Sequence, residues 1–450
     1  MRVRPHRYGV VGVGARAAVY IEALATTYAE RGEIIAWCDP SPTRMSFYDR
    51  VLERAGHPAP ARYRPDGFPQ LLAEQRPDGI VVTSPDHTHH TYVVAALDAG
   101  IDVIVEKPLA TSVTSARAIA QAADASSAEL VVTFNYRYAP RNSELRRILA
   151  EGSVGDVTSV HFEWALDTVH GADYFRRWHR DRTLSGGLLV HKSSHHFDLV
   201  NWWLDDDPQV VHAAGALQFY GRANAVRRGA LDRRVPAAGP DADPFALDLA
   251  GDDVLRQLHL EAESEDGYVR NQDVFGDGIT IEDNAAVLVT YASSAILSYS
   301  LNAHAPWEGY RVSINGTEGR AELEVVERGH VASEGDGGGH AAVDPSIHPN
   351  RPGRARSDDP RPAGQRLLVQ RHWERARELP IPRGEGPHGG GDARLLDDLF
   401  GADPQPDPLR RRAEHRDGLR SLAVGLAANR SIATGRPVRV DDGDLALGRH

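Results

Sequence analysis

The stretch GGLLVHKSSHHFDLVNWWL, residues 186–204, concentrates side chains that can exchange protons. Eight consecutive residues contain His191, Lys192, His195, His196 and Asp198. On a continuous helix, positions 191, 194, 195 and 198 share one face, with Lys192 at its edge. Histidine suits general acid–base catalysis because its unperturbed pKa lies near working pH. We therefore predict a catalytic face, with His195 within hydrogen-bond reach of His191 or Asp198.

Two other interpretations of this stretch stay open. His191 and His195 have the i, i+4 spacing of a zinc-binding helix. Against a metal site, Lys192 follows the first histidine and no third ligand is evident, so we expect no metal. The third interpretation is a structural helix whose histidines are satisfied in the protein interior.

Lysine usage sets two positions apart. Of the 51 basic residues, only Lys107 and Lys192 are lysines. A lysine kept against this bias indicates a need for a compact amine that can change its protonation state, which a guanidinium cannot do. The alternative is that the two lysines stand there by chance.

Composition limits the classes of protein. A length of 450 residues favours two domains. The net charge of −12 argues against nucleic acid or an anionic membrane as a partner. The sequence has no long uncharged apolar run, so we expect no membrane-spanning segment. The single cysteine, Cys38, excludes an internal disulfide and a cysteine-based zinc site. With no signal-peptide pattern at the start, we expect a cytoplasmic protein.

The elements that position cofactor chemistry begin near the amino terminus. A short apolar strand at 8–13 enters a glycine turn and then a helix, with Gly12, Gly14 and Ala17 in the G-x-G-x-x-A pattern. Small residues there permit a tight turn, close approach of backbone to a pyrophosphate, and close packing of helix on strand. The next apolar strand ends in Asp39, whose carboxylate suits ribose hydroxyls and repels a 2′-phosphate. This favours NAD over NADP, although Arg44 weakens the preference.

Strands and helices then alternate through residue 138, which predicts a doubly wound parallel sheet with ligands beyond the carboxyl ends of its strands. The segments TSPDHTHH and EKP lie at such ends. For His89 and His90 we expect helix capping and solvation. For the proline of EKP, the alternative to a functional motif is a simple strand-ending turn.

The second half predicts a different sheet. Residues 156–166 and 284–326 contain alternating strands, typical of a mainly antiparallel sheet with one covered face. An Arg- and Asp-rich insertion at about 221–277 is expected to be a lid or disordered, and residues 333–364 a mobile loop. The segment around His388 is glycine-rich, and the last predicted helix ends at Gly435.

Together, the glycine turn, TSPDHTHH, EKPLA, FNYRYAP and the distal H…DLVNWWL resemble the glucose-fructose oxidoreductase / inositol dehydrogenase / rhizopine catabolism (Gfo/Idh/MocA) family. The resemblance implies an α/β Rossmann domain at 1–135 and, at 136–395, an α+β domain for substrate binding and oligomerisation. That domain would hold a large, open, mostly antiparallel sheet, followed by a helical closing segment at 396–450. The resemblance also implies a homodimer or homotetramer joined through the sheet.

The resemblance assigns roles to individual residues. The cofactor would lie along Gly12, Gly14, Ala17, Asp39, Pro85, His87, Glu106 and Lys107. The catalytic residues would be Lys107, His195 and His191. The substrate would contact Tyr136, Arg137, Tyr174, Arg177, His179, Lys192 and Asp198. One departure stands out: His191 occupies a position where the family has an aspartate, and we expect the loss of that carboxylate to leave His195 less basic.

The implied function is an NAD-dependent oxidoreductase that transfers hydride between nicotinamide and a carbinol carbon of a sugar, polyol or sugar derivative. The alternative is a redox-neutral, glycoside-cleaving enzyme with tightly bound NAD, working by oxidation, elimination, hydration and re-reduction. A catalytically idle, cofactor-binding regulatory protein is the third hypothesis, and the presence of Lys107 and His195 disfavours it.

Overall fold

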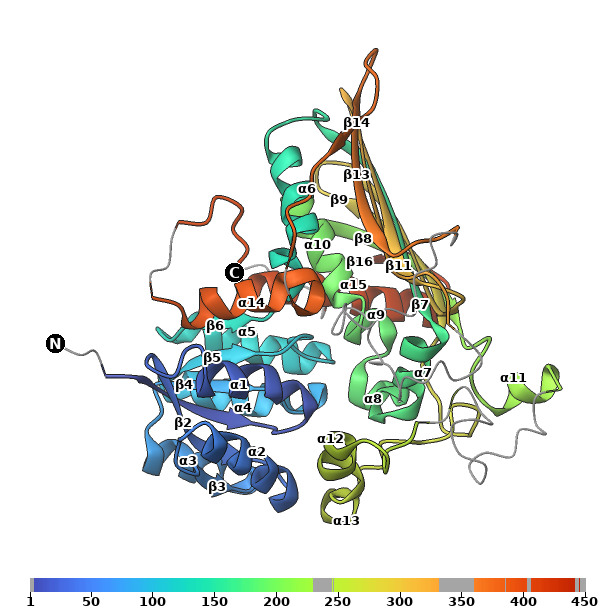
Figure 1. Cartoon of the computed structure of the whole chain (residues 1–450). Coiled ribbons are helices and arrows are strands. Elements are labelled where there is room, and N and C mark those ends of the chain that lie inside the picture. The colour runs from blue at the N-terminus through green and yellow to red at the C-terminus, as the bar shows by residue number, and fades with distance from the viewer. Residues whose placement is uncertain are drawn as a thin grey trace. The chain divides into compact units, whose positions relative to one another are not determined.

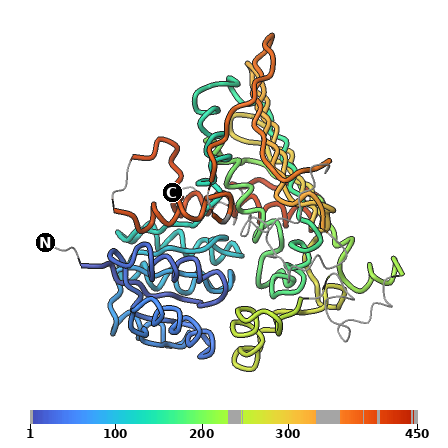
Figure 2. The backbone as a smooth tube through the Cα atoms, viewed as in Figure 1, coloured from blue at the N-terminus to red at the C-terminus, as the bar shows by residue number. Residues whose placement is uncertain are grey.

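Two sheets organise the chain, one of seven strands and one of nine. The computed structural model describes residues 4–229, 245, 247–331, 360–384, 386–402, 406–441 and 445 (Figures 1 and 2). The first compact unit comprises Met1–Phe134, Leu249–Arg270 and Asp392–Leu419, and the second comprises Asn135–Asp248, Asn271–Gly391 and Arg420–His450. Each sheet belongs to one unit, so the expected combination of a Rossmann domain with an α+β domain is confirmed.

The first unit is a doubly wound sheet in the order β15-β6-β5-β4-β1-β2-β3. Its parallel strands are β1 (His6–Val11), β2 (Gly32–Cys38), β3 (Ala61–Tyr63), β4 (Gly79–Val82), β5 (Asp102–Val105) and β6 (Leu130–Val132), and β15 (Ala413–Glu414) adds antiparallel to β6. The helices include α1 (Ala18–Ala25), α2 (Pro42–Arg54), α3 (Phe68–Gln75), α4 (His89–Asp98) and α5 (Val113–Ala125). The continuous apolar strands are buried, as expected of a sheet covered on both faces.

The second unit holds the nine-stranded sheet, in the order β14-β13-β12-β11-β7-β10-β9-β8-β16. Its strands are β7 (Val157–Asp167), β8 (Pro208–Ala216), β9 (Asn284–Tyr291), β10 (Ile296–Ala305), β11 (Glu308–Gly316), β12 (Gly319–Arg328), β13 (Gly364–Arg371), β14 (Arg377–Leu379) and β16 (Val438–Arg439). Among the described strands of this sheet, β7 and β10 are the pair that runs parallel. Burial alternates along β9 and β10, so one face is covered and the other exposed.

Helices on the covered face carry the residues of interest. They include α6 (Pro140–Ala150), α7 (Thr168–Arg176), α9 (Leu188–His191) and α10 (Ser194–Leu204). The α7 helix packs on β7 and β10, where a Cβ on Gly171 would lie 1.7 Å from the carbonyl oxygen of Ala303. Only glycine therefore permits this approach of helix to strand.

Part of the predicted insertion packs with the first unit. Residues 249–270 contain α12 (Asp253–Leu255), a π-helix η6 (Arg256–Leu260) and α13 (Glu263–Asp266), with Leu258 buried in the core of the doubly wound sheet. The sequence boundaries assign this stretch, and residues 392–395, to the second domain. Residues 230–244 and 246 of the insertion, and 333–359 of the expected mobile loop, lie outside the described residues.

Two late helices contribute to the units. Helix α14 (Pro387–Phe400) contains three consecutive left-handed residues, His388, Gly389 and Gly390. Helix α15 (His415–Thr434) ends before Gly435, whose φ of +66° fits the predicted helix stop. In the described part of the chain, no helix is both long and apolar enough to cross a membrane.

Candidate active site

The glycine turn of the first unit is tightly packed on one side and open on the other. Gly12 has φ +80°, and a Cβ there would lie 2.4 Å from Cα of Ser84. Gly14 has nothing within 4 Å of where its Cβ would stand, and its carbonyl accepts a hydrogen bond from Tyr48 at 2.8 Å. Ala17 is fully buried. The turn is thus rigid and leaves room beside Gly14, as a pyrophosphate requires.

Asp39 joins this turn to the end of β2. Its carboxylate accepts from the backbone amides of Val13 and Ser41, both at 2.8 Å. Burial raises the pKa of Asp39, opposed by the charge of Arg44 and by these two hydrogen bonds. A carboxylate has about four acceptor positions, so this one retains capacity for ribose hydroxyls.

Glu106 and Lys107 follow β5. The buried Glu106 carboxylate accepts from Arg16 Nε at 2.5 Å and from Tyr20 Oη at 2.7 Å. Burial opposes its ionisation, but the charges of Arg16 and Lys107 outweigh burial and lower the pKa of Glu106. Lys107 is half-buried. In the structure, Glu106 therefore ties the EKP segment to the helix after the glycine turn.

Pro85 and His87 lie at the short helix η3 (Asp86–Thr88), after β4. Pro85 is exposed and His87 is half-buried. The predicted solvation of His89 is wrong, because its ring is fully buried, with Nδ1 2.9 Å from the Pro108 carbonyl oxygen and Nε2 2.9 Å from that of Ser84. Burial lowers the pKa of His89 to about 4. This histidine links the TSPDHTHH and EKP segments.

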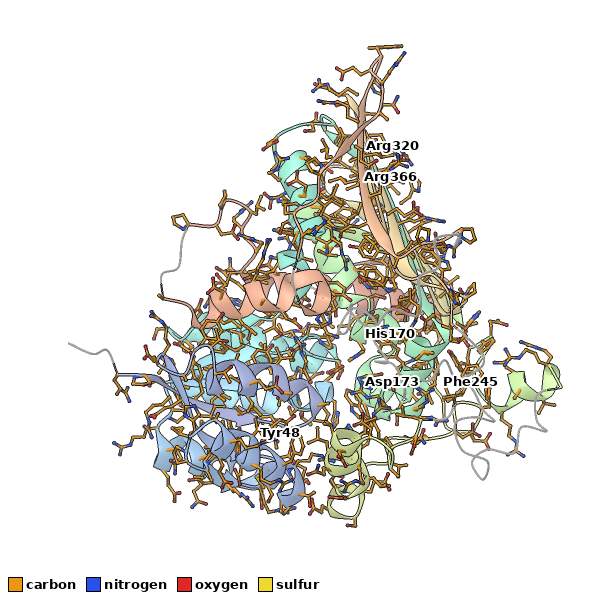
Figure 3. All side chains as sticks on the ribbon, viewed as in Figure 1. Tyr48, His170, Asp173, Phe245, Arg320 and Arg366 are labelled. Atoms are coloured by element: carbon orange, nitrogen blue, oxygen red, sulfur yellow. The ribbon has the colours of Figure 1, made fainter. Side chains whose placement is uncertain are left out.

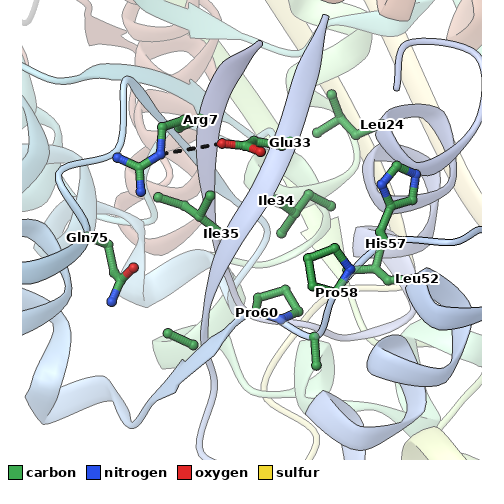
Figure 4. A pocket seen from close by; sticks show the side chains of 12 residues that line it. Arg7, Leu24, Glu33, Ile34, Ile35, Leu52, His57, Pro58, Pro60 and Gln75 are labelled. Atoms are coloured by element: carbon green, nitrogen blue, oxygen red, sulfur yellow. Dashed lines mark ion pairs between the residues drawn. The ribbon is translucent and has the colours of Figure 1, made fainter. Parts of the chain in front are cut away.

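A cavity of about 270 Å³ in the first unit lies apart from these residues (Figure 4). Its walls include Arg7 and Glu33, whose charged groups are 3.5 Å apart, and His57. Glu33, Ile34 and Ile35 stand near the start of β2, whereas Asp39 follows its end. The cavity is therefore near the amino end of that strand, and ligands of doubly wound sheets bind beyond the carboxyl ends.

In the second unit, the continuous helix predicted through the proton-exchanging stretch is wrong. Helix α9 ends at His191 and α10 begins at Ser194. The amides of Lys192 and Ser193 both donate to the carbonyl of Leu188, at 3.0 and 2.9 Å, so the helical hydrogen bonds slip by one residue. Positions 191 and 195 consequently do not follow the face of one helix.

His195 is buried in a stack of rings. Its imidazole lies on Tyr136, with ring centroids 4.4 Å apart and planes 22° apart, and Tyr136 in turn stacks on Trp164 at 5.7 Å. The buried Lys192 ammonium donates to Tyr136 Oη at 3.4 Å and lies 5.1 Å from the Trp164 ring centroid. The structure thus groups three of the predicted residues, Tyr136, Lys192 and His195, in one cluster, here called the His195 stack.

His191 belongs to a neighbouring group of rings. Its centroid lies 4.1 Å from that of His179 and 5.6 Å from that of Tyr174, both edge to face. Trp178 stacks on His179 at 3.8 Å. Three further predicted residues, Tyr174, His179 and His191, therefore come together.

Arg137 and Asp198 bind one another. Arg137 Nε and Nη2 donate to the two carboxylate oxygens of Asp198 at 2.8 and 2.6 Å, and both side chains are buried. This fork joins the segment after β6 to α10. Arg177, also predicted at the site, donates to Asp173 at 3.4 Å and is about one-third exposed.

A hydrogen-bonded chain behind Tyr174 is absent from the sequence prediction. The Glu308 carboxylate bonds His170 Nδ1 at 2.8 Å, and His170 Nε2 bonds Tyr174 Oη at 3.1 Å (Figure 3 labels His170). Glu308 also accepts from the amide of Asp167 at 2.7 Å. The i, i+4 spacing of His170 and Tyr174 on a helix is the signal available in the sequence. Glu308, 138 residues later, has none.

His388 also joins the ring clusters, with its centroid 5.7 Å from that of Tyr136. The glycines after it allow close packing, since a Cβ on Gly391 would lie 2.5 Å from the carbonyl oxygen of Asn135. Among the described residues, no three or more His, Cys, Asp or Glu side chains are arranged to hold a metal ion.

Comparison with known proteins identifies the family. Residues 6–134 match the domain described as "Oxidoreductase family, NAD-binding Rossmann fold" of GFO_IDH_MocA proteins. Residues 146–440 match the corresponding "C-terminal alpha/beta domain". The chain belongs to the Gfo/Idh/MocA oxidoreductase family. It is accordingly an oxidoreductase with an NAD-binding Rossmann domain.

Individual Gfo/Idh/MocA relatives differ in how far they match. YteT of Bacillus subtilis, an oxidoreductase by name, is 34% identical over 95% of this chain and 96% of its own length. Inositol 2-dehydrogenase of Rubrobacter xylanophilus is 28% identical over 46% of this chain and 54% of its own.

Solved structures share the fold. The aldose–aldose oxidoreductase of Caulobacter crescentus, complexed with glycerol, has a TM-score of 0.61 at 18% identity, covering 97% of this chain and 100% of that one. The WlbA dehydrogenase of Bordetella pertussis, in complex with NADH and UDP-GlcNAcA, has a TM-score of 0.60 at 19% identity, covering 97% and 99%.

Proposed function

We propose that this protein is an NAD-dependent oxidoreductase acting on a carbinol carbon of a sugar, polyol or sugar derivative. The observation that carries the substrate class is the buried His195 stack, which combines an imidazole, a phenol and an ammonium with aromatic walls. Apolar walls with a few fixed polar groups suit hydroxyl-rich ligands. The printed names of relatives, inositol 2-dehydrogenase and aldose–aldose oxidoreductase, point to the same class.

The residues of the first unit fit a dinucleotide. Gly12, Gly14 and Ala17 would hold the pyrophosphate, and Asp39 the ribose hydroxyls. Pro85 and His87 would lie along the cofactor, while Glu106 holds the EKP segment through Arg16 and Tyr20. When bound, the nicotinamide supplies the acceptor or donor of hydride.

Two residues would handle the hydroxyl proton. His195 would accept it at an imidazole nitrogen, and the Lys107 ammonium would hydrogen-bond the reacting oxygen. Stacking on Tyr136 fixes the plane of the His195 ring, so the ring is oriented before substrate arrives. His191, with His179 and Tyr174, would contact substrate hydroxyls.

The buried pair of Arg137 and Asp198 changes the roles that we assign to these two residues. Because Arg137 and Asp198 satisfy each other in a bidentate pair, we assign both as positioning residues that hold α10 and therefore His195. Arg177, which is partly exposed beside Asp173, stays a candidate substrate contact.

The proposal is tested by following NADH formation from NAD with a panel of sugars, polyols and sugar acids. We expect turnover with at least one member, and its loss in His195→Ala with NADH binding retained. A protein that binds neither NAD nor NADP would contradict the proposal, as would wild-type turnover in both His195→Ala and Lys107→Ala.

A second candidate is redox-neutral glycoside cleavage with a retained cofactor. Elimination and hydration need an acid–base group besides the one that serves oxidation, and Tyr174, bonded through His170 to Glu308, offers one. Denaturing the purified protein and quantifying released nucleotide separates the candidates. Stoichiometric NAD after extensive dialysis supports cleavage, and reversible binding supports the dehydrogenase.

We further propose a homodimer or homotetramer joined through the exposed face of the nine-stranded sheet. Leu288 and Ile296 on β9 and β10 are half exposed on this face, and large apolar side chains at a sheet surface favour covering by a second copy. Light scattering would report the oligomeric state.

We also propose the cytoplasm as the compartment, since a chain with a single cysteine does not depend on disulfides.

A further inference from the structure

The insertion docks on the part of the Rossmann unit that follows Asp39. Leu258 is buried among the core residues of that unit, and its carbonyl accepts from Arg44 Nε at 2.9 Å. Asp252 caps the first turn by accepting from the amides of Val254 and Leu255. The segment is thus ordered by its own cap and by a shared core, which brings α13 to the beginning of α2.

The beginning of α2 holds a carboxylate. Ser41 caps this 13-residue helix, accepting from the Arg44 amide at 3.1 Å. The Ser41 hydroxyl donates to Glu265, and Thr43 donates to it through its amide at 3.2 Å and its hydroxyl at 2.6 Å. A helix amino terminus with nearby hydroxyls is the donor set that a phosphate group uses, and here Glu265 occupies it.

Arg44 is occupied as well. Its Nη1 lies 2.5 Å from Asp266 and 3.5 Å from Asp39, while Nε is bound to the Leu258 carbonyl. In NADP-binding Rossmann domains an arginine close to this position accommodates the 2′-phosphate. Here that guanidinium is neutralised by carboxylates, one of which comes from 222 residues further along the chain.

The charge state of Glu265 strengthens the effect. Burial opposes its ionisation, but hydrogen bonds from Ser41 and Thr43 outweigh burial and lower the pKa of Glu265. Asp39, Glu265 and Asp266 therefore place three acidic side chains around one arginine. A 2′-phosphate, with about −2 charge near neutral pH, meets repulsion. The donors of Ser41, Thr43 and Arg44 Nη1 are taken by carboxylates, and Arg44 Nη2 is buried.

We propose that Glu265 and Asp266 of the insertion are specificity-determining residues that make this enzyme select NAD over NADP, by occupying the donors that a 2′-phosphate requires. The inference rests on the proposed dinucleotide function and deepens it, since it assigns cofactor selection to a segment remote in sequence from the glycine turn. Asp39 alone would recognise the ribose, and the insertion enforces the rejection.

The test compares NADH and NADPH binding to the full-length protein by fluorescence titration. In wild type, we expect NADH to bind more tightly. In the double variant Glu265→Ala/Asp266→Ala, the Kd for NADPH should fall relative to that for NADH by about tenfold or more, because charge-assisted contacts of this kind become available to the phosphate. The isosteric pair Glu265→Gln/Asp266→Asn keeps the shape, and should move the ratio in the same direction.

A matched control removes the same charge from the same segment. Asp253 and Glu261 both form ion pairs with Arg256. Among the described residues, neither forms a hydrogen bond or ion pair with Arg44, Ser41 or Thr43. Asp253→Ala/Glu261→Ala should leave the ratio unchanged.

The outcomes separate the two claims. Tight NADH binding with an unchanged NADPH ratio in both Glu265/Asp266 variants overturns this inference alone, as does an equal shift in the control pair, which would indicate a long-range charge effect. A wild-type protein that binds neither nucleotide overturns the proposed function with it.

Discussion

The two units hold their candidate functional residues in different ways. In the first unit, Asp39 and His89 are held by main chain: Asp39 accepts two backbone amides, and the two ring nitrogens of His89 each face a backbone carbonyl. In the second, His195 and His191 pack against other rings. Main-chain geometry can be met by few residue types at fixed spacing, whereas packed rings can be exchanged. We therefore expect the fold to tolerate exchange of residues in the ring clusters of the second unit better than at Asp39 or His89.

The largest expected effect, in either unit, is the loss of activity when a residue proposed to transfer the hydroxyl proton is removed. His195→Ala and Lys107→Ala should each lower kcat by about 10²–10⁴-fold, the usual range for a general acid–base group. NADH affinity should change little in His195→Ala, since that residue lies in the second unit. Steady-state kinetics and NADH titration measure both quantities.

His388→Ala serves as the control, because the His388 ring packs against the same Tyr136, with centroids 5.7 Å apart, and has no proposed role in proton transfer. Its kcat should stay within about tenfold of wild type. A loss in His388→Ala equal to that in His195→Ala would show that packing, and not proton transfer, explains the effect.

The next effect concerns stability in the second unit. Arg137→Ala leaves the buried Asp198 carboxylate without its fork, so the free energy of unfolding should fall by about 3–5 kcal/mol. Arg366, paired with Glu378 at 3.0 Å on the exposed sheet, provides the contrast (Figure 3). Arg366→Ala should cost less than about 1 kcal/mol. Chemical denaturation monitored by tryptophan fluorescence compares the two, and equal losses would refute the positioning role.

The buried His89 of the first unit predicts how the stability of that unit depends on pH. Because its folded pKa of about 4 lies below the ordinary 6.5, the unfolded state takes up a proton first as pH falls. The stability contributed by neutral His89 is therefore complete above pH 6.5 and is lost as pH falls towards 4. The shift corresponds to about 3 kcal/mol.

His89→Gln tests this directly. The variant should be less stable at pH 7.5, because it loses the packing of the buried ring and the one N–H that the neutral ring donates to the Ser84 or Pro108 carbonyl. Its melting temperature should depend less on pH between 6.5 and 4. His90→Gln, a matched change at the next residue, should keep the wild-type pH slope. An unaltered slope in His89→Gln would rule out His89 as its source.

Sequence reasoning succeeded where chemistry depends on local main chain. The Gly12 turn, the helix stop at Gly435 and the alternation of parallel strands all follow from spacing and residue type. It failed at the break between α9 and α10, because the slip at Leu188 depends on one shared carbonyl that no pattern encodes. It also missed the Glu308–His170 pair, whose members are 138 positions apart in the sequence. The contact of Glu265 with Thr43 on α2, which spans 222 positions, was missed for the same reason.

The smallest effect tests whether the second unit contains a proton-transfer group besides His195. Tyr174→Phe removes the hydroxyl bonded to His170 at 3.1 Å while keeping the ring beside His191 and His179. A single hydrogen bond of this kind is worth about 1 kcal/mol, so kcat/KM should fall by up to about tenfold, with an altered pH profile. Tyr291→Phe is the control: its buried hydroxyl bonds Asn201 at 2.9 Å in the same unit, outside the ring clusters. If both variants lose activity equally and keep the wild-type pH profile, Tyr174 acts only through packing and supplies no proton-transfer group.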